Sequence, residues 1–277
     1  MAKGIGLIGN FKGKVGNMVG YKLSDSNTGN SQGIRVYQPI VRNPKTSAQA
    51  EQRAKLDPIN ATYRALKMII DRGNEGLPYG NKSRLAWLKQ AFKATSMPWI
   101  NKGVMPTFPV ICQLTKGSLP SVEYTAVEDV LNITCNGVTS ESAVNTVGAI
   151  STLLKAAYPT LKEGDQITFV FGGSLTNGLV FDVFSLVIDS TSSVPVTHFT
   201  AGSDILMFEG QFGGNCGAVI VSREGNNGEH LRSTSSLSIL ADYLEGAPYD
   251  DTSKAAAIES YMSSASANAD WAEESIQ

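Results

Sequence analysis

The stretch GDQITFVFGG, residues 164–173, is rich in β-branched and aromatic residues and has glycine at both ends. Such runs are typical of strands bounded by turns. Similar runs, separated by Gly, Asn and Ser, are EYTAVEDVLNITC (123–135), LVFDVFSLVID (179–189), SVPVTHFT (193–200), DILMFEGQF (204–212) and CGAVIVSRE (216–224). This pattern predicts an antiparallel β-sandwich, Ig-like or jelly-roll-like, of roughly six or seven strands over residues 117–245. One helix within residues 141–161 is expected to be inserted in it or laid across one edge.

Two helices are predicted on the N-terminal side of the sandwich. The first begins within RNPKTSAQAEQRAKL (42–56), where Thr46 or Ser47 can cap it. Pro58 is expected to kink this helix or to restart it with Asp57 as a new cap. Its apolar residues at helical spacing are Leu56, Ile59, Tyr63, Leu66 and Ile70. The second helix, at 82–96, has an apolar face of Leu85, Leu88 and Phe92, and its basic residues Lys82, Arg84, Lys89 and Lys93 lie mostly on the rest of its surface. Residues 46–116 are therefore predicted to form a basic helical module.

The first 45 residues predict a glycine-rich extended β arm. Glycine stands at positions 9, 13, 16 and 20, and a run so rich in glycine should not fold alone in water. IRVYQPIV (34–41) is expected to pair with VGYKL (19–23). Two interpretations stay open: the arm orders against another chain, or residues 9–22 form a hairpin within the monomer, with Gly16-Asn17 at the turn. Residues 246–277 predict an acidic tail or a helix that needs a partner.

Composition predicts an ordinary globular chain. Of its 277 residues, 42% are hydrophobic and 17% are charged, which is enough to bury a core. No apolar run approaches the roughly 18 residues of a membrane span, and no export signal is recognised, so we expect a soluble chain that stays in the cytoplasm of the cell that makes it. Cys112, Cys135 and Cys216 are expected to be small buried residues, with neither a disulfide nor a metal-ligand spacing.

The net charge of −2 hides a strong asymmetry along the chain. Residues 1–116 carry 18 Lys and Arg against 5 Asp and Glu, and residues 117–277 carry 5 against 20. Three interpretations remain open. The basic half binds nucleic acid, the basic part of one copy meets the acidic part of the next, or the molecule simply has two solvated surfaces of opposite sign.

No motif predicts catalysis, a cofactor or a metal site. GIGLIG (4–9) matches a dinucleotide fingerprint in letters, but no strand can precede it. His198 and His230 are the only histidines, and neither lies at ligand spacing to the other; His198 is expected to be half-buried. Ser174 and Ser185 lack the nucleophile-elbow pattern. The chain is therefore not predicted to be an enzyme.

Four blocks in order resemble a known family. FKGKVGNMVGYK (11–22), RNPKTSAQAEQRAKL (42–56), YPTLKEGDQITFVF (158–171) and AVIVSREGNNGEHLRSTSSL (218–237) are similar to an uncharacterised family of gut Bacteroidetes and of the crAss-like phages that infect them. The match spans most of the chain up to about residue 240. The acidic tail after residue 246 departs from the shorter members.

The resemblance implies a virion component, specifically a ring or connector protein of the phage tail below the portal, made in the host cytoplasm. Its expected partners are further copies of itself in a ring, with twelve-fold symmetry as one option, neighbouring portal or tail ring proteins, and DNA that passes through the lumen; no membrane is expected. The residues expected at the subunit interface are Phe11, Lys12, Lys14, Val15, Tyr21, Lys22, Asn43, Pro44, Gln49, Gln52 and Arg53.

Two other functions compete with this one. A nucleic-acid-binding module would use Lys12, Lys14, Lys22, Arg35, Arg42 and Lys45, with only Phe11, Tyr21 and Tyr37 for base stacking. A glycan-binding surface sandwich would need an export signal and an exposed aromatic platform, but Trp87 and Trp99 lie outside the predicted sandwich.

Overall fold

The chain forms two compact units, residues 1–45 and 46–277, named here the arm and the body. The computed structural model describes residues 13–22, 32–37, 46–94, 96–127, 130–175, 178–210, 214, 216–225, 229–240 and 248–263. Because the two units are separate, each is described by itself.

The arm is a three-stranded antiparallel sheet in the order β1-β2-β3, with β1 Gly13–Val15, β2 Met18–Lys22 and β3 Gln32–Val36. Gly16 and Asn17 form the turn between β1 and β2, and Gly16 has a φ of 57°, which glycine adopts without strain. This is the hairpin of the second interpretation. The predicted pairing of VGYKL with IRVYQPIV is confirmed, since Gly20 lies opposite Ile34.

The body is organised around one central sheet. Its strands are β12 (His230–Arg232), β11 (Cys216–Glu224), β7 (Gln166–Leu175) and β8 (Gly178–Val187), in that order, and β14 (Ser238–Ile239) also pairs with β11. The first six residues of β11 are all buried, because both faces of the sheet are covered. Gly217 allows this close packing, since a Cβ there would meet the Val170 carbonyl oxygen at 2.8 Å.

A second antiparallel sheet covers one face of the central sheet. It has the order β5-β6-β10-β9, with β5 Tyr124–Val127, β6 Val130–Thr134, β10 Ile205–Glu209 and β9 Phe199–Ala201. The two sheets share a core that includes Phe169, Val219, Leu131 and Phe208. Ile150 and Leu154 of α4 (Val147–Ala157) join this core, so the predicted helix is present.

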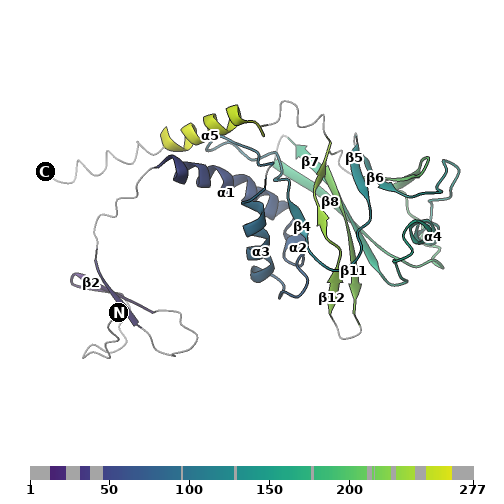
Figure 1. Ribbon diagram of the computed structural model, residues 1–277, viewed down its shortest axis with the longest axis horizontal. Coiled ribbons are helices and arrows are strands. Elements are labelled where there is room, and N and C mark those ends of the chain that lie inside the picture. Colours follow the sequence, from purple (N-terminus) through teal and green to yellow (C-terminus); the bar gives the residue numbers. More distant parts are fainter. Residues whose placement is uncertain are drawn as a thin grey trace. The chain divides into compact units, whose positions relative to one another are not determined.

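Helices cover the other face of the central sheet. They are α1 (Ser47–Ala65), α2 (Lys67–Ile70), α3 (Asn81–Ala91) and α5 (Asp251–Ser263), and the short pair β4 (Gln113–Thr115) and β13 (Ser235–Ser236) lies with them. Val170, Ala218 and Ile220 of the central sheet pack against these helices in a second core. Figure 1 shows the helices on one side of β7, β8 and β11, with β5, β6 and α4 on the other.

The body is thus an α+β, mainly β fold in three layers: helices, central sheet and second sheet. The described strands outnumber the predicted six or seven, because EYTAVEDVLNITC forms two strands and the end of the sheet adds short ones. Residues 46–277 form one compact unit. The change of composition near residue 116 therefore marks the step from the helical layer to the sheets, and the helices share a core with the central sheet.

The first helix begins as predicted but differs from the prediction in two later details. Thr46 caps α1 as predicted, and its Oγ1 accepts the Gln49 N–H at 3.3 Å. However, α1 runs without a restart through Pro58, and Asp57 accepts a hydrogen bond from the Tyr261 hydroxyl of α5 instead of capping a new helix. Leu56 is 40% exposed, while Ile59, Leu66 and Ile70 are buried.

The second helix is shorter than predicted and is rotated about its axis. α3 spans 81–91 instead of 82–96, and Ser83, Trp87 and Ala91 form its buried face. Ser83 is buried because its Oγ donates to the Ile70 carbonyl at 2.8 Å and accepts from Asn74. This hydrogen bonding turns Leu85 outward, where it is 47% exposed.

Candidate assembly interface

The three strands of the arm are paired, but few of the arm residues whose exposure the structure describes are buried. Among the arm residues whose exposure the structure describes, only Gly20 is buried. Met18 and Val36 lie opposite each other in the β2–β3 register and are 40% and 70% exposed. Small sheets without a buried apolar face are marginally stable at best in water. The arm therefore presents apolar side chains that its own described residues do not cover.

Two interactions of Tyr37 fix the local shape of the arm. The Lys14 ammonium lies 3.6 Å from the centre of the Tyr37 ring, a cation–π contact. The Tyr37 N–H also donates to the Asn17 carbonyl oxygen at 2.7 Å, which ties the end of β3 to the hairpin turn. These contacts tie Tyr37, at the end of β3, to β1 and to the hairpin turn.

The residues predicted at the subunit interface divide between the two units. Phe11, Lys12, Asn43 and Pro44 lie outside the described residues. In the arm, Lys14 and Val15 belong to β1, and Tyr21 and Lys22 belong to β2. In the body, Gln49, Gln52 and Arg53 belong to the start of α1, where Gln52 and Arg53 are exposed. The predicted interface residues therefore form two groups, one in each unit.

Gln49 carries an unusual feature for a helix start. Its Oε1 atom is buried and has no hydrogen-bond donor among the described residues. Buried side-chain acceptors are paired in most proteins, because an unpaired one costs free energy. Gln49 therefore points to a position where a donor from outside the described residues would be favourable.

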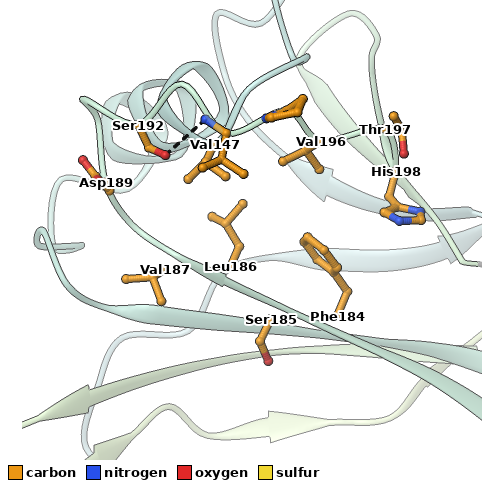
Figure 2. A pocket seen from close by; sticks show the side chains of 12 residues that line it. Val147, Phe184, Ser185, Leu186, Val187, Asp189, Ser192, Val196, Thr197 and His198 are labelled. Atoms are coloured by element: carbon orange, nitrogen blue, oxygen red, sulfur yellow. Dashed lines mark hydrogen bonds between the residues drawn. The ribbon is translucent and has the colours of Figure 1, made fainter.

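An open apolar cavity of about 480 Å³ lies beside β8. Figure 2 shows Phe184 and Leu186 projecting into it from β8, opposite Val147 and Val196, while Ser185 points to the other side of the strand. His198 stands at the rim, half-buried as predicted, with its ring centre 5.5 Å from that of Phe184. The lining is mainly apolar, which suits an apolar side chain better than a charged ligand.

Two polar clamps that the sequence did not predict hold the body together. Arg223 on β11 donates from Nε and Nη2 to the two carboxylate oxygens of Asp165, at 2.6 and 2.7 Å. The Asp165 side chain is only 1% exposed, and its hydrogen bond raises the pKa of Arg223. Asp165 and Arg223 come from the third and fourth blocks of the resemblance, so these blocks contribute directly to the fold.

The second clamp joins the helical part to the strand part. Glu75 accepts hydrogen bonds from the Ser118 N–H and hydroxyl, both at 2.8 Å, and from the Arg232 N–H at 3.1 Å. Burial acts to raise the pKa of Glu75, but the hydrogen bonds from Ser118 and Arg232 outweigh it, and the pKa lies below its ordinary value of 4.5. The sequence gives no signal for this contact, because Arg232 binds Glu75 through its backbone N–H and not through its side chain.

The residue types that commonly carry chemistry are dispersed in the described part of the body. No three His, Cys, Asp or Glu side chains of the described residues come together as a metal site. The three cysteines are free and buried, and burial raises the pKa of Cys112 to about 12 and of Cys135 to about 11. His230 is exposed and its ring lies 5.4 Å from that of Tyr79.

Neither Trp87 nor Trp99 offers a platform for sugar rings. Both belong to the core between the helices and the central sheet, with 1% and 9% of their surface exposed. Among the helices that the structure describes, none is long and apolar enough to cross a membrane.

Comparison of the chain with protein-family models, with curated proteins and with solved structures finds no match.

Proposed function

We propose that this chain is a structural virion protein, a ring or connector subunit of a phage tail, which assembles with copies of itself through its arm. In this role the chain carries out no catalysis. Neighbouring portal or tail ring proteins would flank the ring, and DNA would pass through its lumen. The resemblance of the four sequence blocks to proteins of crAss-like phages motivates the virion setting.

The single observation that carries the proposal is the arm itself. It is a separate unit with strand pairing and with exposed Met18 and Val36, and only Gly20 is buried among the arm residues whose exposure the structure describes. A segment of this kind gains stability when another chain covers its apolar side chains and pairs with its strand edges. The body, in contrast, has two extensive cores of its own, so we expect it to fold without such help.

The distribution of charge supports contact between copies. The arm carries 7 Lys and Arg against 1 Asp or Glu, while the body carries 16 against 24. The arm of one copy and the body of the next therefore attract each other, which favours a head-to-tail interface. A head-to-tail interface generates a closed ring when the rotation between copies closes.

The proposal is tested by native mass spectrometry and negative-stain electron microscopy of the purified full chain. We expect one discrete high-order oligomer that appears as a closed ring. Because opposite charges contribute to the contact, the ring should weaken as salt rises from about 0.05 to 0.5 M. A monomer under all these conditions would contradict the proposal.

Nucleic-acid binding by the basic arm remains the second candidate, favoured by the net positive charge of residues 1–45 and by exposed Lys14 and Arg35. It predicts binding of single- or double-stranded DNA that falls steeply with salt. A mobility-shift assay on the full chain distinguishes the two: DNA binding by a monomer supports this candidate, and a ring without DNA affinity supports the connector.

A further inference from the structure

We infer that the outer edge of β8, at Val183–Val187, is the acceptor site for the arm of a second copy, whose strand β3 adds to the central sheet there. This inference rests on the proposed function, since it names the surface that receives the arm. It adds a specific partner strand and a specific place on the body.

Within the part of the chain that the structure describes, no backbone group outside β7 bonds to β8 at Val183–Val187. β8 is the last strand of the order β12-β11-β7-β8, and no described strand pairs with its other side. The Ile188 N–H donates to Asp165, on the side of β7, at 2.7 Å. Because backbone groups alternate between the two sides of a strand, those of Val183, Ser185 and Val187 point away from β7.

This edge lacks the usual protection against strand addition. Natural edge strands are short, bulged, or carry Lys or Pro. β8 pairs with β7 over ten consecutive positions without a register shift, and its segment Val183–Val187 has neither a charged residue nor Pro; Asp182, the charged residue of β8, precedes this segment. The other described edge strands of the two large sheets are shorter: β5 has four residues, β9 and β12 have three each, and β14 has two.

The surface beside this edge is apolar and exposed. Val183 and Val187 are 49% and 52% exposed, with Val183 on the same face of β8 as Ser185; Val194, which lines the cavity, is 59% exposed. The first half of β8 is covered differently, since Phe181 packs against the helical core and Met105 lies next to Gly178. The free segment is therefore the second half of the strand, with the cavity of Figure 2 on one side of it.

The arm fits this site in length, charge and chemistry. β3 spans five residues, Gln32–Val36, as does the free segment Val183–Val187, and β3 is a terminal strand of the arm sheet. β1, the other terminal strand of the arm, has only three residues. The exposed side chain of Val36 would gain an apolar neighbour, and the basic arm would meet a body with excess acidic residues.

Cysteine cross-linking of the full chain tests the pairing. Arg35→Cys or Val36→Cys on β3 is combined with Val183→Cys, Ser185→Cys or Val187→Cys on β8, so that the possible registers are sampled. The native cysteines are buried and will not interfere. Under mild oxidation at least one pair should produce a ladder of oligomers on a non-reducing gel. Mixing the two single variants should stop at cross-linked dimers. Arg35→Cys with Val127→Cys on β5 is the matched control and should give no ladder.

Substitutions that protect the β8 edge provide a second readout. Ser185→Pro removes an outward N–H that the ladder does not use, and Val183→Lys adds a gatekeeper charge. Each should raise the concentration at half-assembly about tenfold or more, while Val127→Lys should leave it unchanged. Circular dichroism confirms that each variant is folded; Val187→Lys replaces any variant that is not.

Each other outcome contradicts a defined part of the account. A full chain that is monomeric at every concentration contradicts the proposed function and this inference together. A ring that needs the arm, but gives no β3–β8 cross-link and ignores the β8 substitutions, contradicts only this inference. Cross-linked dimers from Ser185→Cys alone would show that β8 pairs with β8 of a second copy. A disulfide between β3 and β8 that forms within single chains, with no cross-linked oligomers, would show that each arm binds its own body.

Discussion

The arm and the body solve the problem of stability in opposite ways. In the body, β7 and β11 are buried on both faces, so a single sheet holds together the helical core and the sandwich core. In the arm, three strands are paired, yet Gly20 alone is buried among the residues whose exposure is described. Burial of apolar surface is the main source of folding free energy, whereas backbone hydrogen bonds contribute little net. From this difference we expect the body to fold without the arm, and our proposal is that the arm gains its stability from another chain.

Phe169→Ala should produce the largest effect on the body. Phe169 is fully buried between the two sheets, with the Phe199 and Phe208 ring centres 5.1 and 5.2 Å away. Its loss leaves a cavity that should lower the free energy of unfolding by about 3–5 kcal/mol. Urea denaturation followed by tryptophan fluorescence measures this change.

Tyr37→Ala in the arm is the matched control for this comparison. It removes an aromatic ring that contacts Lys14 but no core, so the free energy of unfolding of the body should change by less than about 0.5 kcal/mol. An equal loss from both substitutions would show that the arm belongs to the cooperative unit of the body.

Arg223→Met should have the next largest effect. It leaves the carboxylate of Asp165, which is 1% exposed, without its cationic partner, and should lower the free energy of unfolding by roughly 3 kcal/mol. The double variant Arg223→Met, Asp165→Leu removes the unpaired charge and should recover part of this loss. A double variant that is less stable than the single one would mean that Asp165 has a separate role, through the Lys162 N–H that it accepts.

Glu75→Gln should change how the stability of the body depends on pH. The pKa of Glu75 is lowered in the folded state, so its ionised form stabilises the fold above pH 4.5, and this contribution is lost as the pH falls through the folded pKa. The variant should cost up to about 1 kcal/mol at pH 7, and the cost should become smaller as the pH falls below 4.5. Thermal unfolding across this range measures it, and exposed Glu229→Gln is the control. Equal costs above and below pH 4.5 would contradict the clamp.

Gln49→Met should have the smallest effect, and its sign sharpens the comparison. In a chain that begins at residue 46, the variant removes a buried acceptor without a described donor, so stability should stay equal or rise by up to about 1 kcal/mol. In the full chain, a fall in stability would reveal a donor within residues 1–45. An equal change in the free energy of unfolding in both chains would show that Gln49 does not contribute to assembly.

Local patterns in the sequence were sufficient to predict most elements. Runs rich in β-branched and aromatic residues located β7, β8, β10 and β11, and Thr46 was one of two residues, with Ser47, expected to cap the first helix. The β2–β3 pairing was also predicted, from two short β-prone runs. These features depend on near neighbours along the chain.

Features that depend on distant neighbours were not predicted. The sequence changes sign of charge near residue 116, which suggested two modules, but β11 carries apolar residues on both faces and so joins helices and sandwich. The predicted face of α3 was wrong at one residue: Leu88 and Phe92 pack against the core, but Leu85 is 47% exposed. Ser83 is buried instead, because of its hydrogen bonds to Ile70 and Asn74. The free edge of β8 also needed the strand order, since the sequence does not say which strand lies last in the sheet.

The most direct test of the account compares the full chain with residues 46–277 by native mass spectrometry, with circular dichroism on both. We predict that the full chain forms a discrete high-order oligomer and that the truncated chain is a folded monomer. An oligomer of the same size from the truncated chain would contradict the central claim that the arm joins the copies, and a truncated chain that is unfolded would contradict the claim that the body folds by itself.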